Sequence, residues 1–277
     1  MKLNLGCGWD RRDGYLNIDF VTEHHPDLAG DVLNLPLRSG IADEVHAQDV
    51  LEHLGRTSTE DAIKEWHRVT KAGGVARIRV PSLFHAVDIM RRAGTIDVHR
   101  TLLQNLYGTQ AYTGDVHLTC FTDLTIAHAF HDAGYRELVA ELVDTWLWDI
   151  TAVAANGAPV AVFFGDGLSG AEGTAGASWR WSDQSCEVAL INTGPESAKA
   201  DVSFLVQAEH EPSGTIDVRI GDERYALQSR STFSESIVLA PQSRTVIEMT
   251  ARFGRFDVPQ DPRSLYFQIV NPNVSVG

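Results

Sequence analysis

Short apolar runs, bounded by glycine, aspartate or proline, recur through the first part of the chain. Residues 2–6 and 15–20 are two such runs, and residues 75–80 alternate apolar and basic side chains before Pro81. Runs of this length with such boundaries are typical of β-strands. They predict several short strands in this part of the protein.

Segments of helical periodicity separate these strands. Residues 57–61 contain the pattern of a capping box, and apolar side chains follow at helical spacing over residues 62–69. We expect the two glycines at 73–74 to end this helix, because glycine adopts the left-handed C-terminal conformation without steric penalty. A second helix is predicted over residues 122–133, ended by Gly134.

Two apolar, β-rich runs close this part of the chain, at residues 136–143 and 145–155, and a tight turn joins them. Strands that alternate with helices favour a parallel α/β sheet of the Rossmann-like kind. The two closing runs predict an antiparallel pair at its edge. We therefore expect a first domain over residues 1–157.

The remainder of the chain has short alternating strands without a helical pattern. Residues 158–176 are predicted to form a linker or long loop, because residues 165–176 are rich in Gly, Ser and Ala. The strands predicted after it are residues 186–191, 200–206, 215–220, 236–240, 244–250 and 265–270. Turn-forming residues separate these strands, which predicts an all-β sandwich, jelly-roll-like, over residues 177–277.

Composition and charge agree with two soluble domains and exclude some partners. The chain has 277 residues and a formal net charge of −14, from 23 Lys and Arg against 37 Asp and Glu. This length suits two domains of roughly 100–200 residues each. A net acidic chain is a poor candidate for nucleic acid or for an anionic membrane surface.

Cysteine usage and hydropathy predict a cytoplasmic protein. The three cysteines, Cys7, Cys120 and Cys186, have neither the number nor the spacing of a disulfide framework or a zinc site. We expect no metal, no transmembrane segment and no signal peptide, since residues 2–5 already have the pattern of a strand and the longest apolar stretch, residues 150–164, is short and interrupted.

The segment that carries candidate chemistry is Leu3-Asn-Leu-Gly-Cys-Gly8. A strand that ends in Gly-x-Gly brings bare backbone close to a ligand, and ligands of open α/β sheets lie beyond the carboxyl ends of the strands. The next strand ends in Asp19, and an acidic residue at that place is able to bind ribose hydroxyls. Gly-x-Gly alone is a weak signal, and the motifs that follow strengthen it.

Residues 1–155 resemble class I S-adenosylmethionine (SAM)-dependent methyltransferases, closest to a compact bacterial type found in surface-glycan gene sets. The matching motifs are residues 3–8, 14–19, 30–36, 49–53 (Asp-Val-Leu-Glu-His), 66–74 and 117–121. Two departures are that only ten residues separate Gly8 from Asp19, so the usual first helix is absent or very short, and that Ala72 replaces a proline.

The resemblance implies SAM as cofactor and a role for each matching residue. Gly6, Cys7 and Gly8 are then expected at the methionine part of SAM, and Asp19 at the ribose. Phe20 lies against the adenine, Asp31 and Val32 face its polar edge, and Asp49 lies near the reactive methyl group. The product is S-adenosylhomocysteine.

Methyl transfer to a hydroxyl benefits from a general base with a pKa near neutrality, for which histidine is suited. The candidates are His53, His117 and Asp115, with His85 also considered. His53 follows the fourth strand, where a structural histidine that holds the turn by hydrogen bonding is the preferred interpretation. His117 and Asp115 lie in a loop before the last helix, and loops of this kind form acceptor pockets.

These observations predict O-methylation of a sugar hydroxyl in a surface polysaccharide, glycoconjugate or nucleotide-sugar precursor. Methylation of a small metabolite or natural product at oxygen or nitrogen, and a non-catalytic glycan-binding protein, remain alternatives. The second domain loosely resembles β-sandwich modules of bacterial glycosylation enzymes and is a candidate surface for homo-oligomers. Residues 179–181, Trp-Arg-Trp, either stack on a sugar or fill the core of this domain.

Overall fold

The computed structural model describes residues 1–111, 114–174 and 176–276. The chain divides into two units. The first comprises Met1–Ala140 and Asp144–Pro159, and the second comprises Glu141–Val143 and Val160–Gly277.

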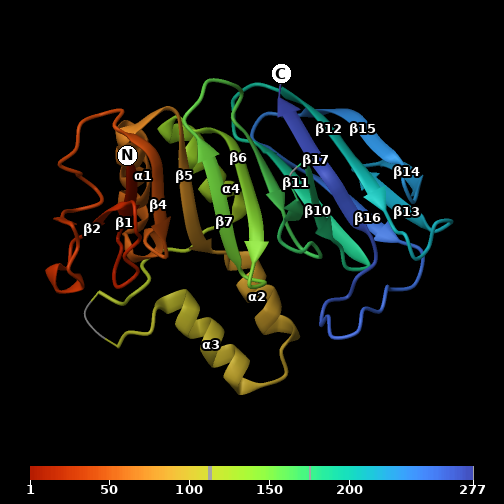
Figure 1. The fold of residues 1–277 in the computed structure, drawn as a ribbon, viewed down its shortest axis with the longest axis horizontal. Coiled ribbons are helices and arrows are strands. Elements are labelled where there is room, and N and C mark those ends of the chain that lie inside the picture. Colours follow the sequence, from red (N-terminus) through yellow and green to blue (C-terminus); the bar gives the residue numbers. More distant parts are fainter. Residues whose placement is uncertain (112–113, 175, 277) are drawn as a thin grey trace. The chain divides into compact units, whose positions relative to one another are not determined.

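The first unit is built on a mixed sheet with the strand order β3-β2-β1-β4-β5-β7-β6 (Figure 1). Its strands are β1 (Lys2–Leu5), β2 (Leu16–Asp19), β3 (Leu28–Ala29), β4 (Ala42–Gln48), β5 (Thr70–Pro81), β6 (Arg136–Val143) and β7 (Leu147–Val153). Strands β1 to β5 pair in parallel, and β7 is antiparallel to β5. This order confirms the expected Rossmann-like sheet, in which β7 runs antiparallel to β5 near one edge.

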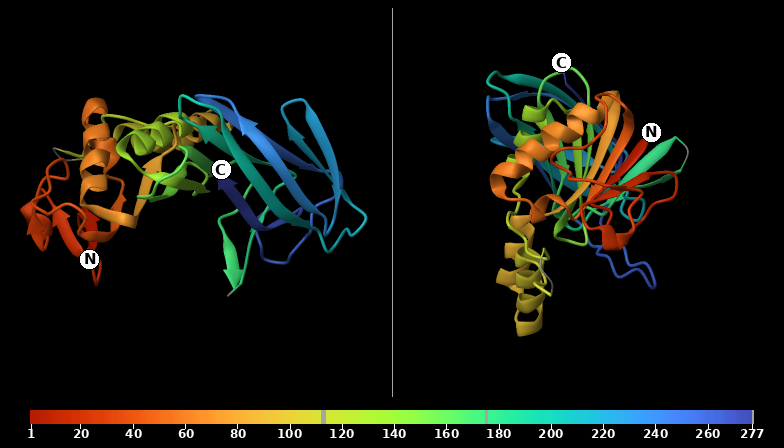
Figure 2. Two further views of the ribbon diagram at one scale, coloured as in Figure 1. Left: turned by 90° about the horizontal axis from the view of Figure 1, so that it is seen from above. Right: turned by 90° about the vertical axis from the view of Figure 1, so that its left-hand side faces the viewer.

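The two faces of this sheet differ in chemistry. One face is apolar, and its register places Leu5 beside Ile18 and Ile78 beside Ala47 and Ile150. Helices α1 (Arg56–Val69) and α4 (Asp123–Ala133) lie on one side of the sheet (Figure 2). Their apolar side chains, including the fully buried Trp66 and Phe130, form the core of this unit.

The opposite face carries polar side chains at the alternate positions of the same strands: Asn4, Asn17, His46, Arg77, Arg79, Asp149 and Thr151. Residues 6–15, all of which the structure describes, contain no helix, as the short spacing predicts. A parallel sheet is ordinarily covered by helices on both faces. Here a loop, in place of a helix, covers this face at β1 and β2. The side chains beneath it are polar because they bond to the loop and do not pack against an apolar helix.

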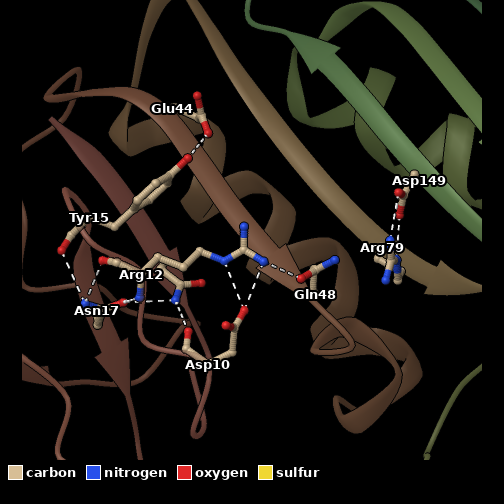
Figure 3. Close-up of polar contacts among 9 residues, drawn as sticks. Asp10, Arg12, Tyr15, Asn17, Glu44, Gln48, Arg79 and Asp149 are labelled. Carbon is tan, nitrogen blue, oxygen red and sulfur yellow. Dashed lines mark hydrogen bonds and ion pairs between the residues drawn. The ribbon is translucent and has the colours of Figure 1, made fainter. Parts of the chain in front are cut away.

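Arg12 links this loop to the strands (Figure 3). Its guanidinium donates to Gln48 at 2.5 Å and to Asp10 at 3.1 Å, and its backbone N–H donates to the side chain of Asn17 at 2.8 Å. The side-chain amide of Asn4 donates to Asn17 at 3.0 Å. These bonds satisfy the buried amide groups of the polar face, which would otherwise cost free energy.

The ends of α1 differ from the prediction. The helix begins at Arg56 after Gly55, without a side-chain cap, so the capping box predicted at residues 57–61 is wrong. It ends at Val69, and the glycines at 73–74 lie within β5. A Cβ on Gly74 would lie 2.9 Å from the carbonyl oxygen of Lys71, so this glycine serves a close backbone approach in the strand.

The ends of α4 agree with the prediction. The Thr122 hydroxyl accepts a hydrogen bond from the backbone N–H of Thr125 at 3.2 Å, and the Thr125 hydroxyl accepts one from the N–H of Thr122. Gly134 ends the helix with a φ of +110°, a value that L side chains rarely adopt.

Two helices, α2 (Leu83–Arg92) and α3 (Ile96–Tyr107), follow β5 beyond the carboxyl ends of the parallel strands (Figure 1). Two short 3₁₀ helices, η1 (Thr22–His24) and η2 (Leu51–His53), follow β2 and β4. Every helix in the described part of the chain is too short or too polar to cross a lipid bilayer.

The second unit consists of strands in the residues that the structure describes. The strands are β8 (Val160–Phe164), β9 (Glu172–Thr174), β10 (Ala177–Trp181), β11 (Ser185–Asn192), β12 (Ala198–Gln207), β13 (Thr215–Ile220), β14 (Glu223–Gln228), β15 (Thr232–Leu239), β16 (Ser243–Ala251) and β17 (Gln268–Val276). One series runs β14-β13-β16-β11-β8, and a five-stranded sheet runs β15-β12-β17-β10-β9. That this unit is a separate jelly-roll sandwich stays a prediction.

The segment expected as a linker, residues 158–176, contains two of these strands. All five residues of β8 are buried, and β8 pairs with β11 in antiparallel register. The apolar run at residues 160–164 therefore behaves as a core strand, and the glycine-rich character of the following residues concealed it. Strand β14 was missed because its side chains are largely polar and exposed.

Candidate active site

A cavity of about 510 Å³ lies at the carboxyl ends of β1, β2 and β4 in the first unit. Its lining residues are Gly6, Gly8, Asp19, Phe20, Val21, His24, Asp31, Val32, Asp49, Val50, His53, Leu54 and Gly114. This is the edge of an open α/β sheet at which ligands bind. Eight of the residues predicted from sequence are in this lining.

The two glycines of the first turn have different surroundings. Gly6 has a φ of +58°, and a Cβ there would lie 2.7 Å from Cγ2 of Val50. Gly8 has a φ of +48°, and nothing in the described structure lies within 4 Å of the position of its Cβ. Gly6 is therefore required by packing within the fold, while Gly8 leaves open space beside the cavity.

Asp19 is held by backbone donors on both carboxylate oxygens. The N–H of Gly8 donates to Oδ2 at 2.7 Å, and the N–H of Val21 donates to Oδ1 at 2.7 Å. The ring of His24 is 3.3 Å from Oδ1. The carboxylate thus joins the end of β2 to the turn after β1, and it keeps lone pairs for a ligand hydroxyl.

Residues 20 and 31–32 form another part of the lining. Phe20 is 79% exposed, which is unusual for a large aromatic side chain and leaves a ring face free for stacking. Asp31 accepts a hydrogen bond from the N–H of Leu33 at 2.9 Å. The carbonyl of Val32 accepts one from the indole of the buried Trp66 at 3.0 Å, which attaches this loop to α1.

Asp49 follows β4 and has a φ of +53°, an uncommon value for a residue other than glycine. Burial raises the pKa of its carboxyl, and the positive charge of Arg79 on β5 counteracts part of that effect. Arg79 itself forms two hydrogen bonds with Asp149, at 2.6 and 2.9 Å (Figure 3). Asp49 is therefore an exposed residue of the cavity wall whose carboxyl is partly screened from solvent.

Glu52, in η2, is an ionisable residue near this site that sequence analysis did not select. It is 1% exposed, and burial raises the pKa of its carboxyl to about 8. Its backbone carbonyl accepts hydrogen bonds from the N–H groups of Leu118 and Thr119, at 2.7 and 3.3 Å. Glu52 is part of the motif Asp49-Val-Leu-Glu-His53, but its burial depends on the distant loop that contains Leu118 and Thr119.

His53 lines the cavity, whereas the other two candidate bases do not. The ring of His117 packs edge-on against that of His53 with a centroid distance of 4.7 Å. Burial lowers the pKa of His117, and the neighbouring ring of His53 lowers it further. Asp115 accepts a hydrogen bond from the hydroxyl of Thr109, which holds it within its loop.

Two more predicted residues lie away from the lining. Cys7 is 5% exposed, and its backbone N–H donates to Ile18 at 3.1 Å, so it ties the turn to β2. The ring nitrogen Nδ1 of His85 is 2.6 Å from the hydroxyl of Ser82 at the start of α2. Within the described residues, His, Cys, Asp and Glu side chains form no group of three placed to hold a metal ion.

Residues 3–78 match the family model described as a methyltransferase domain. The first unit therefore carries a methyltransferase domain. This similarity supports a methyltransferase that uses SAM as its cofactor. The match ends within β5 and includes Gly6, Gly8, Asp19, Asp31 and Asp49. No curated protein matches the sequence of this chain.

Solved structures that resemble part of this chain include the following three. A possible exported protein from Bordetella parapertussis has a TM-score of 0.43 and 13% identity over 56% of this chain and 62% of its own. A SAM-dependent methyltransferase from Methanosarcina mazei has a TM-score of 0.43 and 15% identity, over 56% of this chain and 92% of its own. A possible histamine N-methyltransferase from Thermotoga maritima has a TM-score of 0.38 and 13% identity, over 55% of this chain and 81% of its own.

The chain thus spans less than two thirds of the first of these proteins. TM-scores below 0.5 carry no weight for the function of this chain. The family match and the geometry of the cavity are independent of them. A bare glycine beside open space, a carboxylate with free lone pairs and an exposed aromatic ring fit the backbone, ribose and adenine contacts that SAM requires.

Proposed function

We propose that the protein is a SAM-dependent O-methyltransferase that acts on a sugar hydroxyl of a surface polysaccharide, glycoconjugate or nucleotide-sugar precursor. In this proposal Gly6, Gly8 and Asp19 hold the methionine and ribose parts of SAM. Phe20 stacks on the adenine, whose polar edge is bound by Asp31 and Val32. Cys7 contributes through the backbone turn that it stabilises.

The observation that carries the proposal is the position of His53 in the same cavity wall as Gly8, Asp19 and Asp49. Bound SAM supplies a methyl group on a sulfonium, which is a good leaving group, so that catalysis consists mainly of positioning. A hydroxyl acceptor must also lose its proton, and in this proposal the imidazole of His53 accepts it. His117 supports this ring through their edge-on contact.

Strand β10 supports a carbohydrate acceptor. Trp179 and Trp181 lie on one side of the strand and are half-buried, whereas Arg180 between them is buried. Arg180 pairs with Glu141 at 2.5 Å and lies 3.8 Å from the ring of Phe164, all within the second unit. The tryptophans are thus not the core of this unit, and indole rings that keep some exposure suit stacking on a sugar ring.

Acceptor screening with methyl-labelled SAM tests the proposal. We expect label in nucleotide sugars or oligosaccharides, and NMR of the product identifies an O-methyl group. Label confined to amines or small phenols would instead support the alternative of a small-metabolite methyltransferase. Absence of SAM binding in calorimetry would contradict the function as a whole.

A histidine pair makes this test residue-specific. His53→Gln is expected to lower kcat at neutral pH by about 10²–10⁴-fold, with little change in the Kd for SAM. His128→Gln, on the exposed surface of α4, is the matched control and should retain wild-type activity. Equal kcat values for the two variants would remove His53 from the mechanism.

The wider assignments belong to the same proposal. We take residues 1–157 as the catalytic domain and residues 177–277 as a β-sandwich accessory domain that supports homo-oligomers. A cytoplasmic location is consistent with a nucleotide-sugar or small-molecule acceptor. Sedimentation of the full chain at several concentrations tests the oligomeric part.

A further inference from the structure

Glu52 is a buried residue, and one oxygen of its carboxyl group lacks a hydrogen-bond partner in the described part of the chain. Its side chain is 1% exposed, and Oε2 has no hydrogen-bond partner among the residues that the structure describes. The two hydrogen bonds from Leu118 and Thr119 go to its backbone carbonyl and hold the residue in place. Ionisation of such a carboxyl is costly unless a positive charge comes close to it.

The charged groups around Glu52 come from several elements. Asp49 precedes it in the same segment, and its negative charge acts together with burial to raise the pKa of Glu52. Arg79 on β5 already forms two hydrogen bonds with Asp149 on β7. His53 follows Glu52 in η2, and the 114–122 loop brings His117 against His53, with Asp115 near it.

We propose that the Glu52 carboxyl is protonated in the free protein and releases its proton when SAM binds. The inference rests on the proposed binding of SAM in this cavity. Asp49 lines the cavity and acts electrostatically on Glu52, so a cation bound beside Asp49 favours the ionised form of both carboxyls. SAM carries a sulfonium and an ammonium charge, and its product has lost the sulfonium charge.

The proton balance of this step is simple. The O–H bond of Glu52 breaks, the proton passes to solvent buffer, and the carboxylate keeps the electron pair. S-adenosylhomocysteine, with one positive charge fewer, holds Glu52 ionised less strongly. The proton therefore returns in part after methyl transfer, and the residue responds to the charge that distinguishes cofactor from product.

Titration calorimetry of the full chain with SAM measures the released proton. At pH 7.5, the binding enthalpy should differ between phosphate and Tris by an amount that corresponds to nearly one proton released per SAM. Release on S-adenosylhomocysteine binding should be smaller. SAM affinity should rise about tenfold per pH unit between pH 6 and 8 and level off above that.

Two glutamine variants assign the proton. Glu52→Gln should abolish both the buffer dependence and the pH slope, whereas Glu60→Gln, an exposed carboxyl on α1, should leave them as in the wild type. Wild-type protein that binds SAM without releasing a proton would overturn the inference and leave the proposed function intact. Proton release that persists in Glu52→Gln would also overturn it.

The wild-type measurements decide the question even if Glu52→Gln fails to fold. In that case the pH slope and the difference between SAM and its product still show whether a group with a pKa near 8 is coupled to the sulfonium charge. Absence of any SAM binding would contradict the proposed function first, and this inference with it. The two failures are therefore distinguishable.

Discussion

Asp19 and Glu52 are two buried carboxyls at the same edge of one sheet, and their surroundings differ. Asp19 is 7% exposed and accepts hydrogen bonds from two backbone N–H groups. Glu52 is 1% exposed, and its Oε2 accepts none from the described residues. Similar burial therefore accompanies a satisfied carboxylate in one region and a carboxyl with a pKa of about 8 in the other.

The difference lies in the backbone around each residue. Asp19 receives hydrogen bonds from the N–H of Gly8, in the loop after β1, and from the N–H of Val21, just after β2. Glu52 lies in η2, where the N–H groups of His53 and Leu54 bond to carbonyls of the turn, and the N–H of Glu52 itself only partly offsets the effect of burial on its carboxyl pKa. Donors aimed at a carboxylate, more than burial itself, decide whether it stays ionised.

The largest effect is expected from removing the unsatisfied carboxyl. The folded protein holds the Glu52 proton at pH values where the unfolded chain, with an ordinary glutamate pKa, has lost it. Wild-type stability should therefore fall as pH rises from about 4.5 to 8, by about 1.4 kcal/mol per pH unit from this group. Glu52→Gln lacks this slope and should be more stable than wild type by roughly 4 kcal/mol at pH 8.

Urea denaturation at pH 5, 6.5 and 8, without cofactor, measures this difference. The two proteins should be nearly equal in stability at pH 5 and diverge as the pH increases. Glu60→Gln is the control and should follow the wild type at each pH. A constant difference between Glu52→Gln and the wild type would mean that Glu52 is ionised throughout.

Removing the hydrogen-bonded carboxylate of Asp19 should be harmful, in contrast to removing that of Glu52. Asp19→Ala removes an acceptor that organises the Gly8 turn and is assigned to the ribose hydroxyls. We expect the Kd for SAM to increase on the order of 100-fold, because charge-assisted hydrogen bonds are lost. Calorimetry checks this, with Asp27→Asn, outside the cavity lining, as a control that should bind normally.

Much of this arrangement follows from sequence because strand ends are easily recognised. Gly6, Gly8 and Asp19 follow or close a short apolar run, Asp49 was assigned from the family motif, and all four reach the cavity. Their roles toward SAM stay predictions. The strand order of the first unit also agrees with the resemblance, since the alternation of apolar and polar residues determines which face each strand buries.

What sequence did not predict depends on contacts between distant segments. The environment of Glu52 requires the loop at residues 117–119, and His24 and Gly114 reach the cavity from loops. The buried β8 was taken for part of a linker because a glycine-rich stretch follows it. Helix α1 ends before its glycines because Thr70 is extended and starts β5.

A third prediction separates packing from ligand contact within the first turn. Gly6→Ala should lower stability by about 2 kcal/mol, from its clash with Val50 and its positive φ. Gly8→Ala should lower stability by about 1 kcal/mol, from its φ alone. Relative to this loss of stability, it should weaken SAM binding more than Gly6→Ala does. Chemical denaturation and calorimetry on both variants provide the two readouts.

The double variant Gly6→Ala/Val50→Ala sharpens this contrast. Removing the Cγ atoms of Val50 takes away the 2.7 Å clash, so part of the Gly6→Ala loss should be recovered relative to the sum of the single changes. Simple additivity would show that the backbone conformation, and not Val50, sets the requirement for glycine. The same companion change should not improve Gly8→Ala, which has no clash to relieve.

The smallest effect is expected on the polar face of the sheet. Arg79 and Asp149 are paired by two hydrogen bonds but remain partly exposed, so breaking the pair with Asp149→Asn should cost at most about 1 kcal/mol. Arg79→Met should have a similar effect on stability but a distinct one on the site. It removes the charge that lowers the pKa of Asp49, so that the pKa of Asp49 should rise further. Carboxyl-carbon NMR titration of Asp49 tests this. An unchanged pKa of Asp49 in Arg79→Met would show that Arg79 does not influence this carboxyl. The polar face would then have no effect on the cavity edge next to Glu52.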